Sequence, residues 1–333
     1  MRLEEIKYLY QKIKKESISS EKSVFYFCAY VPCELIYASG FKPIRFLPSP
    51  IYFARSDEYL PKYLCPYLRS ITEEVLREDK RFEKVIFTDS CDSSRRIFEV
   101  WRYLNLSKEI YFLQIPFGEK EEDVRYFAKN IRDLFYFLNT KGNIENIFES
   151  INIYNLGRKK IRNSWQYSLL FYSMDIKEFL KLSFEPTNDN NKKFYLFSTV
   201  YPIELIEYME NLNLNIIYDD SCFGIRTEEE IKILDDDPFY SLAYYYLKRE
   251  GCVRRRNLLD KISMIKERVK KENIKGVIFY SLKYCDPLLF YIPILKEELR
   301  KENIPSLILE DDFTMGIKGQ IRTRLEAFLE MVG

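Results

Sequence analysis

The sequence contains no histidine among its 333 residues. Histidine is the commonest general base near neutral pH and a frequent metal ligand, so its absence excludes His-based catalytic triads and His-ligated zinc sites. Thiolates and carboxylates remain for any such chemistry. The seven cysteines include no CxxC pair, which argues against a zinc ribbon.

Long apolar runs and a dominant sign of charge are also missing. One of the longest apolar runs, Leu288 to Leu295, is interrupted by Pro293 and falls short of the ~18 residues that a membrane span needs. The first sixteen residues predict an amphipathic helix and not a signal peptide, because charged residues interrupt them throughout. Lysine plus arginine (52) nearly balances aspartate plus glutamate (51) without long tracts of one sign. We therefore expect a cytoplasmic protein with no membrane span and no nucleic-acid partner.

Short β-rich runs alternate with helix-period segments along the chain, the pattern of parallel sheets with helical crossovers. The length predicts about two domains, large enough to fold without disulfides. The polar segment from Phe184 to Lys193 is the candidate boundary. This gives an N-terminal α/β domain over residues 1–190 with a helical extension and a C-terminal α/β domain over 191–333. The sequence shows no internal repeat strong enough to use. The predicted strands are Val24 to Tyr30, Lys84 to Thr88, Ile110 to Gln114, Lys193 to Ser198, Asn215 to Tyr218, Gly276 to Leu282 and Ser306 to Leu309.

Three cysteines stand where helices are expected to begin. Cys91 follows a predicted strand and precedes a helix for which Ser93 or Ser94 is a plausible N-cap. Cys285 also follows a strand and precedes Pro287, a residue suited to the first helical position of a helix expected over Leu288 to Lys301. Cys65 is followed by a proline and a helical stretch, although no clear strand leads into it. In this division Cys65 and Cys91 belong to the first domain and Cys285 to the second.

This placement favours thiolates, because helix N-termini and nearby cations such as Arg69, Arg95 and Arg96 stabilise negative charge. Soft thiolates select iron–sulfur clusters or zinc over hard cations. Three ligands would leave one iron of a cubane open to bind a substrate oxygen. The alternative for each cysteine is a small core side chain, since free cysteines are among the most buried residues.

These residues and their surroundings resemble the D-component family of 2-hydroxyacyl-CoA dehydratases, which also includes benzoyl-CoA reductase subunits and double-cubane cluster proteins. The resemblance spans nearly the whole chain. The segments that carry it are FCAYVPCELIYASGFKPIRF (Phe27 to Phe46), LCPYLRS (Leu64 to Ser70), DSCDSSRRIFEVW (Asp89 to Trp101), YFLQIP (Tyr111 to Pro116), DDSCFGIR (Asp219 to Arg226), GVIFYSLKYCDP (Gly276 to Pro287) and GQIRTRLEAFLE (Gly319 to Glu330).

The resemblance implies two flavodoxin-like or Rossmann-like α/β domains with a [4Fe-4S] cluster in the cleft between them, held by Cys65, Cys91 and Cys285. It also implies a related second subunit or homodimer and an ATP-dependent iron–sulfur activator that injects one electron. The implied substrate is an acyl-CoA, whose thioester is reduced to a ketyl radical anion that expels the neighbouring hydroxyl.

Two alternatives to this function stay open. A second set of cysteines, Cys28, Cys222 and Cys252, would suit an [8Fe-9S] double cubane in a protein that drives low-potential reduction of a small molecule or another metalloenzyme. A non-catalytic electron-relay or assembly partner is the other possibility. Cys33 is expected to be a core thiol.

Carboxylates near predicted strand ends could supply the base that histidine cannot. Glu34, Asp219 and Glu310 are the candidates, with Asp220 and Asp311 beside two of them. The competing interpretation is that each is a solvated loop acid or a helix cap.

Overall fold

The structure is a computed structural model, and it divides the chain into two compact units that are described separately below. Unit 1 comprises Met1–Leu47, Val75–Phe184 and Thr227–Gly251, and unit 2 comprises Pro48–Glu74, Glu185–Arg226 and Cys252–Gly333. The residues that it describes are 3–18, 20–47, 49–78, 81–139, 142–161, 165–184, 192–224, 226, 229–250, 252, 258–314 and 318–333.

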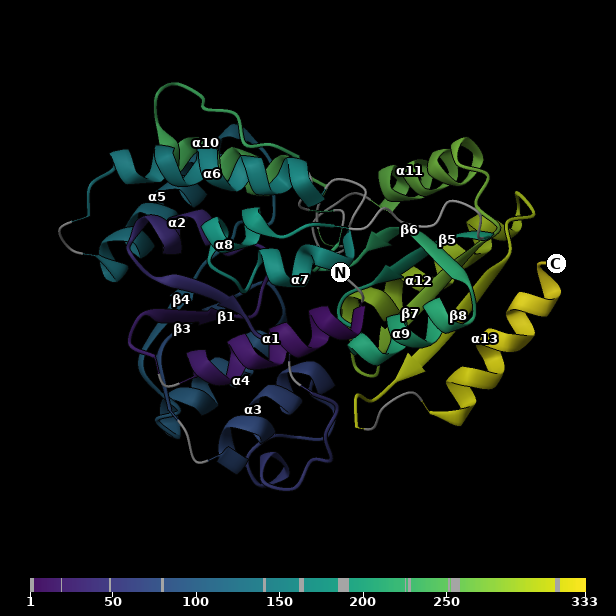
Figure 1. Ribbon diagram of the computed structural model, residues 1–333. Coiled ribbons are helices and arrows are strands. Elements are labelled where there is room, and N and C mark those ends of the chain that lie inside the picture. The colour runs from purple at the N-terminus through teal and green to yellow at the C-terminus, as the bar shows by residue number, and fades with distance from the viewer. Residues whose placement is uncertain are drawn as a thin grey trace. The chain divides into compact units, whose positions relative to one another are not determined.

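Unit 1 is built on a sheet of four parallel strands in the order β2-β1-β3-β4. Figure 1 labels three of them, β1, β3 and β4. Aromatic side chains fill the core beside it, where Trp101 of the helix α4 stacks on Phe82 and meets Phe27 and Phe87 edge-on. Such pairs add to the free energy gained by apolar burial. The strands are β1 (Ser23–Tyr26), β2 (Lys42–Arg45), β3 (Phe82–Thr88) and β4 (Ser107–Leu113). The helices are α1 (Leu3–Ser17), α2 (Cys33–Ala38), α4 (Asp92–Tyr103), α5 (Glu121–Leu138), α6 (Glu145–Ile161), α7 (Ser168–Phe171), α8 (Ile176–Lys181) and α10 (Pro238–Lys248), with a 3-10 turn η2 (Trp165–Tyr167).

Unit 2 is built on a second parallel sheet, in the order β6-β5-β7-β8. Every residue of its central strand β7 is buried, as expected for a strand covered on both faces. The strands are β5 (Lys192–Ser198), β6 (Leu214–Asp220), β7 (Gly276–Leu282) and β8 (Ser306–Asp311). The helices are α9 (Ile203–Asn211), α11 (Leu258–Lys271), α12 (Asp286–Arg300) and α13 (Gly319–Met331). The turn η1 (Ser56–Glu58) and most of α3 (Pro66–Glu78) also belong to this unit, and the division falls within α3.

The two sheets share one strand order. Numbered within its own unit, each runs 2-1-3-4, the order in which flavodoxin-like folds begin. In such sheets the chain changes direction between the first and third strands, and ligands bind beyond the carboxyl ends of the strands at that point. The predicted α/β class with two parallel sheets is thus confirmed, and the duplication of topology was not visible as a sequence repeat.

The structure also differs from the sequence prediction in places. Strand β2 was not predicted, because Pro43 interrupts a run of only four residues; it lies at the sheet edge, where proline is tolerated. The predicted boundary after residue 190 lies outside the described residues. The contact-based division also differs from a single cut, since Pro48–Glu74 groups with unit 2 and Thr227–Gly251 with unit 1. Among the described residues, no helix is long and apolar enough to cross a membrane.

A buried ion pair ties three helices of unit 1 together. The guanidinium of Arg158 (α6) donates to the carboxylate of Glu34 (α2), whose other oxygen accepts from the Tyr246 hydroxyl (α10) at 2.8 Å. Arg158 also donates to the Tyr245 hydroxyl at 3.1 Å. Glu34 and Arg158 are 0% and 1% exposed, so neither charge has water to replace its partner.

Glu34→Gln should therefore destabilise the protein by roughly 3–5 kcal/mol, because it leaves the Arg158 charge buried without its counter-ion. The measurement is urea denaturation followed by circular dichroism. Glu297→Gln, which breaks the exposed pair of Glu297 with Arg300, is the matched control and should leave the midpoint nearly unchanged. Equal midpoints for the two variants would contradict a structural role for Glu34.

Candidate functional site

Cys91 lies where strand β3 leads into helix α4 in unit 1. It is itself the N-cap of α4, and its Sγ accepts a hydrogen bond from the Ser94 N–H at 3.4 Å. The predicted caps, Ser93 and Ser94, were therefore wrong by two to three residues: the Ser94 hydroxyl instead donates to the Thr88 carbonyl at 2.7 Å. Because the Cys91 sulfur faces the exposed amides of a helix start, negative charge on it is favoured.

Cys28 follows the neighbouring strand β1 and lies close to the Cys91 loop. Its thiol donates to the Ser90 hydroxyl at 3.3 Å, and Ser90 also bonds the Thr88 hydroxyl at 2.8 Å. Cys33, in contrast, is fully buried in α2, and burial raises its pKa well above the usual value. Unit 1 thus holds two partly exposed thiols at the carboxyl edge of adjacent strands.

Cys285 occupies the corresponding place in unit 2. It follows β7, the third strand of its sheet, and is the N-cap of α12. The helix begins at Asp286, so Pro287 is its second residue and not, as predicted, its first. The Cys285 Sγ lies 3.8 Å from the Thr199 hydroxyl, just beyond the end of β5. Cys91 and Cys285 therefore stand at the same position of the two sheets, the ends of their third strands.

Cys65 directly precedes α3 and interacts with Cys285. Burial raises the pKa of Cys285, and the charge of Cys65 in the same unit raises it further. Arg69 was expected to stabilise negative charge near Cys65. Its guanidinium instead pairs with Asp57 and donates to the Lys62 carbonyl at 3.1 Å. Arg95 and Arg96 likewise face Asp89 and Asp92, each at 3.5 Å.

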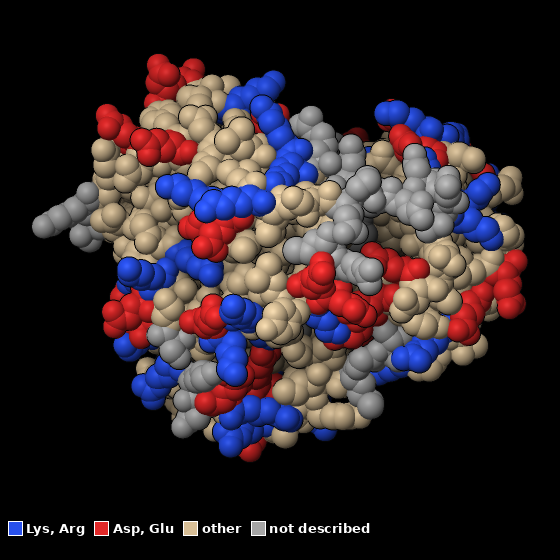
Figure 2. All heavy atoms as spheres, viewed as in Figure 1, with Lys and Arg blue, Asp and Glu red and all other residues tan. Residues whose placement is uncertain are grey.

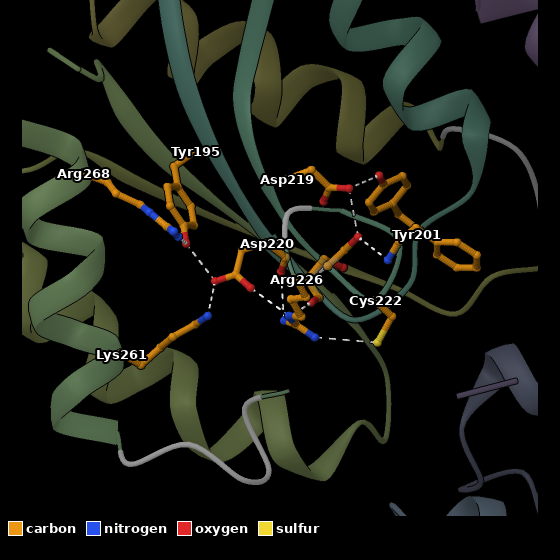
Figure 3. Close-up of polar contacts among 11 residues, drawn as sticks. Tyr195, Tyr201, Asp219, Asp220, Cys222, Arg226, Lys261 and Arg268 are labelled. Atoms are coloured by element: carbon orange, nitrogen blue, oxygen red, sulfur yellow. Dashed lines mark hydrogen bonds and ion pairs between the residues drawn. The ribbon is translucent and has the colours of Figure 1, made fainter. Parts of the chain in front are cut away.

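Cys222 follows β6 and lies beside a buried ionic cluster, which we define as Asp220, Arg226 and Lys261 (Figure 3). Arg226 donates to the Cys222 sulfur at 3.7 Å and to Asp220 at 2.9 Å. The backbone N–H of Cys222 donates to the Thr199 carbonyl at 2.9 Å, so Thr199 contacts both Cys222 and Cys285. The charge of Cys252 also acts on Arg226.

Thiols are the donor set that iron–sulfur clusters require, and the described residues offer them at helix starts. Among these residues, no group of three or more Cys, Asp or Glu side chains lies close enough to hold a single metal ion. Cys65 and Cys285 are such donors in unit 2, at the starts of α3 and α12. Cys91 belongs to unit 1.

Asp219 is a buried carboxyl group that can hold a proton near neutral pH. Its Oδ2 accepts from the Tyr201 hydroxyl at 2.7 Å and from the Ser221 hydroxyl at 2.9 Å. Burial raises its pKa to about 7, despite those two bonds. The turn that follows β6 needs glycine at position 224, because a Cβ on Gly224 would lie 1.8 Å from the Asp219 carbonyl oxygen.

Asp220, the next residue, is ionised. Burial opposes its charge, but Lys261 and Arg226 outweigh burial and lower its pKa to about 2. The Tyr195 hydroxyl donates a further bond at 2.7 Å, as Figure 3 shows. Two adjacent carboxyls whose environments separate their pKa values are a recurrent mark of acid–base sites, although ion-pair networks produce the same effect.

The other two carboxylate candidates have different settings. Glu34 is the buried partner of Arg158 described above. Glu310 is exposed near the end of β8, whereas its neighbour Asp311 is buried and accepts from the Tyr280 hydroxyl at 2.6 Å. Sequence reasoning missed Tyr201, Thr199, Arg226 and Lys261, because their roles depend on contacts between distant segments. Arg226 is the last residue of the DDSCFGIR segment, which was noted in the sequence only as part of the family resemblance.

The face of the molecule in Figure 2 has no large area of only positive or only negative side chains. Figure 2 shows positive and negative side chains interspersed there, in line with the nearly equal numbers of basic and acidic residues.

Comparison with known proteins identifies the family. Residues 28–332 match the family described as 2-hydroxyglutaryl-CoA dehydratase, D-component. The chain belongs to this family. Its relatives include the (R)-phenyllactyl-CoA dehydratase beta subunit of Clostridium sporogenes, 23% identical over 94% of this chain and 92% of that protein. A benzoyl-CoA reductase subunit of Thauera aromatica is 21% identical over 96% of this chain and 92% of that protein. The lactoyl-CoA dehydratase beta subunit of Anaerotignum propionicum is 21% identical over 91% of this chain and 90% of that protein.

These relatives of the D-component chain are subunits of dehydratases and of a reductase, which supports an enzymatic role in an assembly with a partner subunit.

The raised pKa of Asp219 predicts a pH-dependent stability. Between about pH 4 and pH 7 the folded state holds a proton at Asp219 that the unfolded state releases, so the free energy of unfolding falls as the pH rises through this window. Asp219→Asn should therefore be more stable than the parent at pH 8, by up to roughly 4 kcal/mol. The gain should vanish near pH 4.

The measurement is urea denaturation across pH 4–8. Asp133→Asn, at an exposed position of α5, serves as the control and should follow the parent curve. A constant offset of the Asp219→Asn variant at every pH would show that Asp219 is ionised throughout.

Proposed function

We propose that the chain is the iron–sulfur subunit of a 2-hydroxyacyl-CoA dehydratase-like enzyme and that Cys65, Cys91 and Cys285 ligate a [4Fe-4S] cluster. One observation carries this proposal: Cys91 and Cys285 cap helices at the ends of corresponding strands in two sheets of equal order. Cys65, at the start of α3, interacts with Cys285. The proposed ligand set takes Cys91 from unit 1 and Cys65 and Cys285 from unit 2.

Each proposed ligand lies at the start of a helix: Cys65 at α3, Cys91 at α4 and Cys285 at α12. A helix N-terminus presents unsatisfied N–H groups and a positive partial charge, so the three helix starts would stabilise an anionic cluster and its sulfides. Partial burial restricts water around the Cys285 thiol. When bound, the cluster would supply one-electron transfer at low potential.

The names of the relatives support the substrate and partner classes. Two relatives are named for 2-hydroxyacyl-CoA substrates, phenyllactyl-CoA and lactoyl-CoA, and a third for benzoyl-CoA. We therefore propose an acyl-CoA thioester as the substrate of the assembled enzyme, a related second subunit or second copy as partner, and an ATP-dependent iron–sulfur activator as electron donor. Whether the assembly eliminates water or reduces its substrate is decided by product analysis.

Among the three carboxylates proposed as a base, Asp219 has the setting that suits proton transfer. It is buried, its Oδ2 is fixed by Tyr201 and Ser221, and its pKa of about 7 lets it gain or release a proton at neutral pH. Its segment reaches Cys285 through the Cys222 and Thr199 contacts. We propose that Asp219 exchanges a proton when the site is reduced or reacts.

The double cubane is the second candidate, and the cysteine placement gives it specific support. Cys28 of unit 1 contacts the loop of Cys91 through Ser90, and Cys222 and Cys252 of unit 2 both act on Arg226. The second set therefore draws on the two units in the same way as the first, one cysteine from unit 1 and two from unit 2.

The test is iron and sulfide analysis of protein purified without oxygen. About four irons per chain supports the single cubane and about eight the double cubane. Cys65→Ala, Cys91→Ala and Cys285→Ala should each abolish or strongly reduce iron binding and the visible absorbance, whereas the matched control Cys33→Ala should keep both. An iron-free parent, or variants that retain a full complement of iron, would refute the ligand assignment.

A further inference from the structure

We infer that Arg249 is an anion-binding residue at the carboxyl edge of the first sheet, and that its guanidinium takes a compact oxyanion, the carboxylate or phosphate group of a ligand. The site lies within unit 1. It depends on a buried cation and not on a thiol, so its test is independent of the proposed cluster.

Arg249 is buried, yet its charge has no carboxylate partner. The residue is 4% exposed, and its hydrogen bond runs from Nη2 to the Ala29 carbonyl at 2.5 Å. Its Nε is buried without a hydrogen-bond partner. Within the described part of the chain, no carboxylate forms an ion pair with this guanidinium. Burying an unpaired charge is costly, so a counter-ion is expected here.

Two other buried arginines show the usual arrangement. Arg158 and Arg226 are each 1% exposed, and each pairs with a buried carboxylate, Glu34 and Asp220 respectively. Glu34 is already engaged, because one of its oxygens binds Arg158 and the other accepts from Tyr246. Arg249 therefore differs from both in having its positive charge left for a ligand to neutralise.

Three tyrosine rings lie around the Arg249 guanidinium. Its Cζ is 4.4 Å from the ring centroid of Tyr246, 5.4 Å from that of Tyr245 and 5.8 Å from that of Tyr30. The ring faces attract the cation, but they do not replace the in-plane acceptors that its N–H groups need. Carboxylate and phosphate oxygens match the planar fork of a guanidinium and would complete the site.

The place of Arg249 in the fold is one where ligands bind. Ala29, which accepts its hydrogen bond, lies three residues beyond the end of β1 at Tyr26. β1 is the first strand of its sheet and pairs with β3, so the chain changes direction between these two strands. The Cys28 thiol contacts Ser90 at 3.3 Å, so the loops that follow both strands meet there. The charge of Arg249 is thus held at the edge where such sheets bind ligands.

A structural role at the end of α10 does not account for this side chain. Arg249 is the C-cap of α10, a position from which cations often donate to the last carbonyls of their own helix. Its guanidinium instead donates to Ala29, in a different segment. The charge is therefore directed toward the strand end and not toward the helix that carries it.

The experiment is isothermal titration calorimetry of the full chain, purified without oxygen, in a buffer free of oxyanions. Acetate and inorganic phosphate are the probes, and their relative affinities distinguish a carboxylate ligand from a phosphate ligand. The parent should bind one anion per chain. Arg249→Lys keeps the charge but loses the fork, so binding should weaken about tenfold. Arg249→Met should abolish it.

The matched control is Arg322→Met, which removes an exposed guanidinium that also lies over a tyrosine ring, that of Tyr208 at 5.2 Å. It should bind as the parent does. Three results would overturn the inference: a parent that binds neither anion, an Arg249→Met variant that binds as the parent does, and an Arg322→Met variant that loses binding to the same extent.

Circular dichroism checks that each variant folds. If the Arg249 variants do not fold, a crystal structure of the parent grown with acetate decides. An acetate hydrogen-bonded to Arg249 supports the inference, and a guanidinium bonded only to Ala29 and water would refute it.

Discussion

Parallel strand pairing is the constraint on which the functional chemistry of this protein depends. In a parallel sheet all carboxyl ends lie along one edge, and each connection that returns through a helix starts that helix at the same edge. Cysteines placed two or three residues after a strand are therefore gathered where helix N-termini point outward. Cys28 and Cys91 in unit 1 and Cys222 and Cys285 in unit 2 all occupy such places. The protein lacks histidine, and in each unit these thiols follow the strand ends, with the buried carboxyls of Asp219 and Asp220 at the end of β6.

Charge is handled differently in the two units. In unit 1 the buried pair of Glu34 and Arg158 joins helices, and its contacts are satisfied inside the fold. In unit 2 the buried charges of Asp220, Arg226 and Lys261 lie beside Cys222, and Asp219 next to them is poised to exchange a proton. Asp220, which is held in an ion-pair network, and Asp219, whose pKa is about 7, are thus adjacent in the chain. Arg226 and Lys261 both pair with Asp220. Removing either cation would leave the buried Asp220 carboxylate with one counter-ion fewer, which would destabilise the fold.

Much of the fold was predictable from local patterns. Strand β7 matched its predicted range because a run of β-branched and aromatic residues between Gly276 and Leu282 has no helical period. The start of α12 was predicted to within two residues from Pro287, since proline favours the beginning of a helix. In contrast, β2 escaped prediction because it is short and contains proline, and the segment Pro48–Glu74 grouped with unit 2 because of contacts that only tertiary structure reveals. Cys65, Cys91 and Cys285 could be selected from sequence as candidates, whereas the contacts of Thr199 with Cys222 and Cys285 needed the folded chain.

Differential alkylation of the cysteines tests the central claim most directly. Protein prepared without oxygen is treated with iodoacetamide before and after removal of its iron, and the labelling of each of the seven cysteines is measured by mass spectrometry. The account predicts that Cys65, Cys91 and Cys285 are protected while iron is bound and become labelled once it is removed. Cys33, which is fully buried in α2, should not change. Protection that leaves out Cys65, Cys91 and Cys285, or labelling that ignores the presence of iron, would contradict it.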